Sequence, residues 1–133
     1  MGRIVLIVDD DSDDRDFFSE ALHELDPTIE CKCAKNGQEA LELLNGSKKL
    51  LPDFIFLDLN MPRLSGIQCL KTIKKDKNLS NIPVVIFSTT KQDQEAEETR
   101  ELGAVLFLTK PPTYTELVKR LSYVLSQATH TTK

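Results

Sequence analysis

The chain alternates short apolar segments with longer amphipathic segments, and this alternation constrains the fold more than any other feature of the sequence. The first apolar segment, RIVLIV at residues 3–8, is a continuous run rich in β-branched residues, which is typical of a strand buried on both faces. The next segment, residues 12–25, places Phe18, Leu22 and Leu25 on one face of a helix. The same alternation predicts strands at 3–8, 28–34, 53–57, 82–88 and 104–109, and helices at 12–25, 36–46, 65–76, 91–103 and 113–127.

Strand–helix units that follow one another in this way predict an α/β fold. Consecutive buried strands joined by helices form a five-stranded parallel sheet with helices on both faces. A length of 133 residues suits one compact domain, and no linker or repeat interrupts the pattern. We therefore predict a single domain over residues 1–133, with a core over about 3–127 and a short frayed tail at 128–133.

Composition excludes several classes of protein. The formal net charge of −4 argues against a nucleic-acid groove, which needs a basic face. No apolar stretch is long enough for a membrane span. The odd number of cysteines and the lack of a C-x-x-C motif favour a reducing, cytoplasmic setting. Cys31, Cys33 and Cys69 are best interpreted as small hydrophobic residues, although a metal or redox role for the first two stays open.

Polar side chains follow four of the expected strands, at the point where each strand ends. In open parallel α/β sheets, ligands bind outside the carboxyl ends of the strands, so we expect these side chains to converge. They are Asp9, Asp10 and Asp11 after the first strand, Asp58 and Asn60 after the third, Ser88 and Thr89 at the end of the fourth, and Lys110 after the fifth. Pro111 follows Lys110 directly.

This set of residues has a chemical logic. Neighbouring carboxylates repel one another, and a hard divalent cation such as Mg²⁺ relieves that repulsion with oxygen ligands. A carboxylate beside Mg²⁺ can act as the nucleophile in phosphoryl transfer and form an aspartyl phosphate. The metal, a lysine and a hydroxyl group would then neutralise the charge on the phosphoryl oxygens. Asp58, alone at the end of the run FIFL, is the candidate nucleophile.

Four motifs resemble the receiver domain of two-component response regulators. They are VDDD at 8–11, LDLNMP at 57–62, IFST at 86–89 and LTKP at 108–111, and they occur in the family's order. The resemblance extends over about residues 3–127 and implies a flavodoxin-like (βα)5 receiver fold. Because no output domain is visible, it also implies a stand-alone, single-domain response regulator.

The resemblance implies a role for each acidic residue of the motifs. Asp58 corresponds to the phosphoacceptor, and Asp10 corresponds to the direct Mg²⁺ ligand of the acidic pair. Asp9 is its partner, which often acts through water, and Asn60 would offer its backbone carbonyl to the metal. Asp11 extends the acidic pair to a triple, and we expect it, or Ser12, to cap the helix that follows.

The remaining motif residues also acquire roles from the resemblance. Ser88 corresponds to the hydroxyl that moves toward the phosphoryl group, and Lys110 to the lysine that pairs with the acids and the phosphate. The bond from Lys110 to Pro111 is cis in the family. Phe107 stands where receivers carry a switch aromatic, usually tyrosine, so it is either a switch or an ordinary core residue. The sequence departs from the commonest receiver pattern at Phe107, Thr89, Pro112 and Asp11. These departures bear on how the domain switches and on how long the phosphoryl group persists, but not on the core chemistry.

These roles predict a signalling protein that accepts a phosphoryl group from a histidine kinase or a phosphotransfer protein. The segments LPDFIFLDLNMP and NGSKKLLPD resemble small receivers paired with phytochrome-type kinases. The signal would pass to a downstream protein or along a phosphorelay, and the protein would not be an enzyme beyond its own phosphorylation and slow dephosphorylation. One alternative is a pseudo-receiver that binds partners without phosphorylation. A phosphatase of the haloacid dehalogenase type is disfavoured, since Asn60 stands where that group needs a second aspartate.

Overall fold

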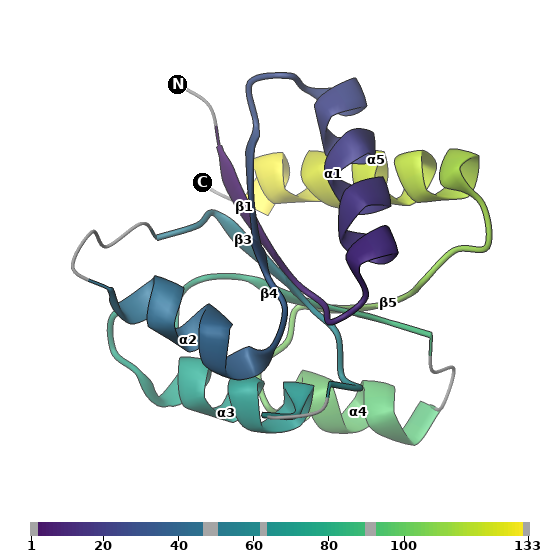
Figure 1. Ribbon diagram of the computed structural model, residues 1–133. Helices are drawn as coiled ribbons and strands as arrows, with labels where there is room; N and C mark the ends of the chain where they lie inside the picture. The colour runs from purple at the N-terminus through teal and green to yellow at the C-terminus, as the bar shows by residue number, and fades with distance from the viewer. Residues whose placement is uncertain (1–2, 47–50, 62–63, 90–92, 132–133) are drawn as a thin grey trace.

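The computed structural model describes residues 3–46, 51–61, 64–89 and 93–131. Within these ranges, strands and helices alternate along the chain (Figure 1). The elements are β1 (Ile4–Val8), α1 (Ser12–Leu25), β2 (Glu30–Ala34), α2 (Gly37–Asn45), β3 (Phe54–Leu57), α3 (Gly66–Lys75), β4 (Val84–Ser88), α4 (Asp93–Glu101), β5 (Leu106–Thr109) and α5 (Tyr114–Thr131). Parts of some predicted features lie outside the described residues: residues 1–2 and 132–133, residues 47–50 of the NGSKKLLPD loop, Pro62 of the second motif, and residues 91–92 of the fourth helix.

The strands form one parallel sheet in the order β2-β1-β3-β4-β5. Helices α1 and α5 cover one face of the sheet, and α2, α3 and α4 cover the other (Figure 1). The predicted α/β architecture is therefore confirmed. The chain moves from β1 to β2 on one side and to β3 on the other, so the carboxyl ends of β1 and β3 flank the point where the strand order reverses.

An aromatic cluster holds α1 against the sheet. The ring of Phe18 lies 4.8 Å from that of Phe56 and 5.7 Å from that of Phe87, measured between centroids. Phe18 and Phe56 are completely buried, and burial of one such side chain contributes roughly 1.5–3 kcal/mol. The cluster fixes the first turn of α1 close to the carboxyl ends of β1 and β5, where the predicted site lies.

Side-chain caps determine where the helices near this edge begin. Asp11 is the N-cap of α1, and its carboxylate accepts hydrogen bonds from the backbone N–H groups of Asp13 and Asp14. This confirms the predicted capping role. Asn36 and Ser65 cap α2 and α3 in the same way. None of the described helices combines the length and the apolar character needed to cross a bilayer.

The C-terminal end of the chain differs from its prediction. Helix α5 continues to Thr131, so residues 128–131 are helical and do not form the predicted frayed tail. The sequence there contains no glycine or proline that would end the helix, so backbone hydrogen bonding continues past Gln127.

Candidate functional site

The structure brings the acidic side chains at the ends of β1 and β3 together. One carboxylate oxygen each from Asp9, Asp10 and Asp58 lies within 4.8 Å of the other two. Asp9 is completely buried and Asp58 is 5 % exposed, whereas Asp10 is exposed to solvent. The cluster therefore has a buried floor and one open side.

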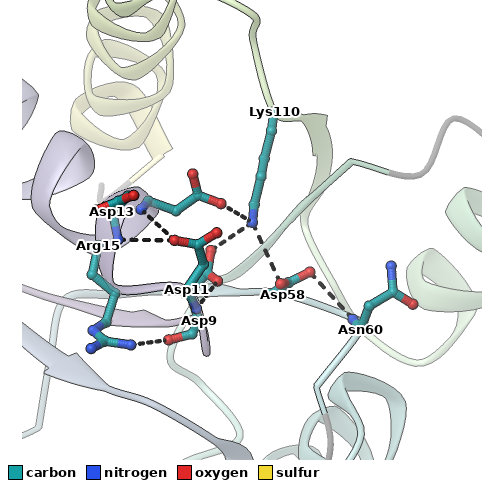
Figure 2. A network of polar contacts seen from close by, with 8 residues as sticks. Asp9, Asp11, Asp13, Arg15, Asp58, Asn60 and Lys110 are labelled. Carbon is teal, nitrogen blue, oxygen red and sulfur yellow. Dashed lines mark hydrogen bonds and ion pairs between the residues drawn. The ribbon is translucent and has the colours of Figure 1, made fainter.

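Lys110 supplies a positive charge to this cluster. Its ammonium nitrogen lies 2.7 Å from Oδ2 of Asp9 and 3.5 Å from Oδ2 of Asp58 (Figure 2). It also lies 2.8 Å from Oδ2 of Asp14. The lysine side chain is 11 % exposed, so water screens these contacts only weakly. One cation faces more than one carboxylate, which leaves the site with an excess of negative charge.

Burial and the neighbouring charges shift the pKa values of Asp9 and Lys110. Burial raises the pKa of the Asp9 carboxyl above its usual value, and this outweighs the opposite effect of Lys110 and of the Asp11 backbone N–H. Burial alone would lower the pKa of Lys110, but its contacts with the carboxylates of Asp14 and Asp9 outweigh burial and hold the pKa above the usual value. Lys110 is therefore charged at neutral pH.

Backbone contacts hold Asp58 in place. Its N–H donates to the carbonyl of Val8 at 3.0 Å, and the N–H of Asn60 donates to its Oδ1 at 3.3 Å. Gly66 lies against the backbone of Asp58. A Cβ atom at position 66 would lie only 2.4 Å from the Asp58 carbonyl oxygen. Only glycine permits this close approach between the start of α3 and the backbone of Asp58.

The loop after β1 is organised around Asp9. The N–H of Asp11 donates to Oδ1 of Asp9 at 3.0 Å, while the Arg15 guanidinium donates to the Asp9 carbonyl at 2.7 Å (Figure 2). Asp9 itself donates its N–H to the carbonyl of Ala34 at the end of β2. These contacts hold the Asp9 carboxylate and the adjoining backbone in one orientation.

Of the other predicted site residues, Ser88 lies at the same edge of the sheet, whereas Phe107 lies within β5. Ser88 is buried at the end of β4, and its carbonyl accepts a hydrogen bond from the N–H of Lys110 at 2.8 Å. Phe107 is half-buried against the core on the sheet face that α2, α3 and α4 cover, and it lines a pocket with Ala96 and Thr99 of α4. The predicted cis bond at Pro111 is wrong for this structure, because the described residues contain no cis peptide bond. The trans form is the lower in energy for an ordinary X–Pro bond, and here it is compatible with the Lys110 contacts.

Sequence reasoning missed two residues, Asp14 and Arg15. Both lie in the first turns of α1 and outside the four motifs. Asp14 and Lys110 are separated by 96 positions in the chain, so no local pattern joins them. The acidic first turn of α1 was visible in the sequence, but its contact with Lys110 depends on how α1 packs.

The donor set fits a hard divalent cation. Carboxylate oxygens are the ligands that Mg²⁺ and similar ions prefer, and those of Asp9, Asp10 and Asp58 are close enough to share one ion. Oδ2 of Asp9 is buried, and its contact with Lys110 is an ion pair without hydrogen-bond geometry. A buried carboxylate oxygen in this state retains a lone pair for a metal ion.

Comparisons with known proteins agree with this geometry. The chain is 34 % identical over 125 residues to the phosphate regulon transcriptional regulatory protein PhoB of Pseudomonas aeruginosa. The aligned region covers 94 % of this chain and 52 % of PhoB. The chain thus spans about half the length of this relative.

Two solved structures are also similar. The phosphorylated cyanobacterial phytochrome response regulator RcpA has a TM-score of 0.90 at 26 % identity, over 100 % of this chain and 98 % of that one. The Mn²⁺-bound form of response regulator Rcp1 has a TM-score of 0.84 at 28 % identity, over 93 % and 92 % of the two chains. The family model of the response regulator receiver domain matches residues 5–122. The chain therefore belongs to the response regulator receiver domain family, the receivers of two-component systems.

Proposed function

We propose that Asp58 accepts a phosphoryl group in a reaction that requires Mg²⁺. The observation that carries the proposal is the position of this carboxylate, which lies beside Asp9 and Asp10 on one side and 3.5 Å from the Lys110 ammonium on the other. A nucleophilic carboxylate, a metal-binding acidic pair and a cation are the groups that phosphoryl transfer to an aspartate needs.

The reaction would proceed by in-line displacement. A lone pair on an Asp58 carboxylate oxygen attacks phosphorus, and the bond from phosphorus to the donor breaks, so that its electron pair leaves on a histidine nitrogen of the donor. Mg²⁺ held by Asp9, Asp10 and Asp58, and by the backbone carbonyl of Asn60, would neutralise charge on the phosphoryl oxygens.

Two further residues of this chain would act on the phosphoryl group after transfer. Lys110 would pair with one phosphoryl oxygen, and the Ser88 hydroxyl would donate to another. Phe107 would follow Ser88 inward, as a switch residue that changes the surface of the domain. The pocket that Phe107 lines together with residues of α4 leaves space for such a movement.

The donor in this proposal is a histidine kinase or a phosphotransfer protein of the cytoplasm. Similarity to RcpA, a phytochrome response regulator, supports a phytochrome-type kinase as the source of the phosphoryl group. The phosphorylated domain would then signal by binding a downstream protein through the surface of α4, β5 and α5, or by passing the phosphoryl group along a relay. It would act as a signalling module and not as a hydrolase.

Intact-mass measurement after incubation with acetyl phosphate and Mg²⁺ tests the proposal. The wild-type chain should gain one phosphoryl group, and Asp58→Asn should gain none. The control is Asp16→Asn, which removes an exposed carboxylate from α1 and should be phosphorylated like the wild type. A wild-type chain that gains no phosphoryl group would contradict the proposal and favour a pseudo-receiver.

A further inference from the structure

Lys110 lies nearer to an acidic residue of α1 than to the proposed phosphoacceptor. Its ammonium nitrogen is 2.8 Å from Oδ2 of Asp14 and 3.5 Å from Oδ2 of Asp58. A lysine ammonium has three N–H donors. Its two short contacts go to Asp9 and Asp14, and the long one goes to Asp58.

The Asp14 carboxylate competes with Asp58 for the Lys110 ammonium. The Asp14 side chain is 35 % exposed, whereas Lys110 is 11 % exposed, so the pair is partly shielded from water. Such a charge-assisted hydrogen bond is stronger than one between neutral groups. Because Asp14 lies on the α1 side of the ammonium, it opposes any movement of Lys110 toward Asp58.

Asp14 can also be left without Lys110 at little cost. Asp14 and Lys110 line a cavity of about 270 Å³, together with Phe17, Phe87, Pro112 and Tyr114. Water in this space can hydrate the carboxylate after the ammonium moves away. The N-terminus of α1, where Asp14 lies in the first turn, also favours a negative charge.

We propose that Asp14 is a positioning residue that holds Lys110 away from Asp58 until a phosphoryl group draws the ammonium across. This inference rests on the proposed function. When phosphorus becomes bonded to Asp58 and the donor leaves with the electron pair of the broken bond, the dianionic phosphoryl group outcompetes the single charge of Asp14. Asp14 thereby lowers the stability of the phosphorylated state relative to the unphosphorylated one. When the phosphoryl group is lost, Asp14 binds the Lys110 ammonium again.

The substitution Asp14→Asn tests the competition, because it preserves size and removes the charge. Binding of beryllium trifluoride, an acyl-phosphate analogue, to the Mg²⁺-loaded chain measures the affinity directly by titration calorimetry. We expect Asp14→Asn to bind this probe about two- to fivefold more tightly, which corresponds to a partly exposed ion pair worth up to roughly 1 kcal/mol. The acetyl phosphate concentration that gives half-maximal phosphorylation should fall by a similar factor.

Two matched variants separate the contact from general effects of charge. Asp13→Asn removes an exposed carboxylate from the same turn of α1, and the structure shows no contact between its side chain and Lys110 within the described residues, so it should bind like the wild type. Asp14→Glu retains a carboxylate and should return the affinity to within about twofold of the wild type.

The outcomes are distinct. If Asp14→Asn binds no more tightly than Asp13→Asn, or binds more weakly than the wild type, the inference is overturned. If Asp14→Asn only lowers the unfolding midpoint and leaves probe binding unchanged, Asp14 has a structural role and the inference is again overturned. If the wild type itself is never phosphorylated, the proposed function has failed, which is a different result.

Discussion

Replacing Lys110 with methionine would leave the carboxylates at this edge of the sheet without their cation. Methionine has a similar length and keeps the apolar packing of the side chain, so the substitution mainly removes charge. Asp9 is the residue most affected, because it is completely buried and its Oδ2 lies 2.7 Å from the ammonium.

The expected loss of stability follows from this burial. Removing one partner of a buried ion pair costs roughly 3–5 kcal/mol, because a charge remains buried without compensation. The contact with Asp14 is partly exposed and adds little. We therefore expect Lys110→Met to lower the free energy of unfolding by about 3 kcal/mol at pH 7 without metal, out of a total of roughly 5–15 kcal/mol.

The loss of stability in Lys110→Met should become smaller as pH falls. The native pKa of Asp9 lies above its usual value and should rise further when Lys110 is removed. Between the unfolded and the native pKa the native state binds more protons, so the free energy of unfolding increases as pH falls through the native pKa. The raised pKa of Lys110 keeps its own contribution fully present below the unfolded pKa of about 10.4. The deficit of Lys110→Met should therefore shrink between pH 7 and about pH 5.

Urea unfolding in EDTA, followed by circular dichroism, measures these differences, because the chain contains no tryptophan for fluorescence. The control is Lys32→Met, since the ion pair between Lys32 and Glu30 is exposed and should contribute less than about 1 kcal/mol. If Lys110→Met loses no more stability than Lys32→Met, or if its deficit grows as pH falls, then Lys110 does not compensate the buried charge of Asp9.

Three other predictions concern packing and cysteine reactivity. Gly66→Ala should lower the free energy of unfolding by at least about 2 kcal/mol in urea titrations, because the added Cβ would lie 2.4 Å from the Asp58 carbonyl oxygen; an unchanged midpoint would refute the close approach. Phe56→Ala should cost about 3–5 kcal/mol in the same assay, because its ring is completely buried, and a loss below about 1 kcal/mol would contradict that burial. Burial raises the pKa of Cys69 to about 12, so a thiol reagent should modify the exposed Cys33 quickly and Cys69 only after unfolding; fast modification of Cys69 in the native chain would contradict its burial.

Most of the fold was accessible from the sequence because it depends on local patterns. The apolar runs at β1, β3 and β4 are nearly continuous, and only a strand buried on both faces needs such a run. The position of Asp9, Asp58 and Lys110 at one edge follows from parallel strand order alone, since each residue comes directly after its strand.

The parts that the sequence did not predict depend on packing between distant segments. The contact of Asp14 with Lys110 exists because the Phe18 cluster fixes the position of α1 over the sheet. The hydrogen bond from Arg15 to the Asp9 carbonyl has the same origin. Helix α5 extends to Thr131 because the segment after Gln127 contains no residue type that ends a helix.

Locating the phosphoryl group on the chain tests directly whether Asp58 is the phosphoacceptor. After treatment with acetyl phosphate and Mg²⁺, borohydride reduces an aspartyl phosphate to homoserine, and peptide sequencing by mass spectrometry identifies the reduced position. We predict homoserine at position 58 alone, and none in a sample that received no phosphodonor. Homoserine at Asp9 or Asp10, or a phosphorylated chain that yields none at position 58, would contradict the assignment of Asp58 as the phosphoacceptor.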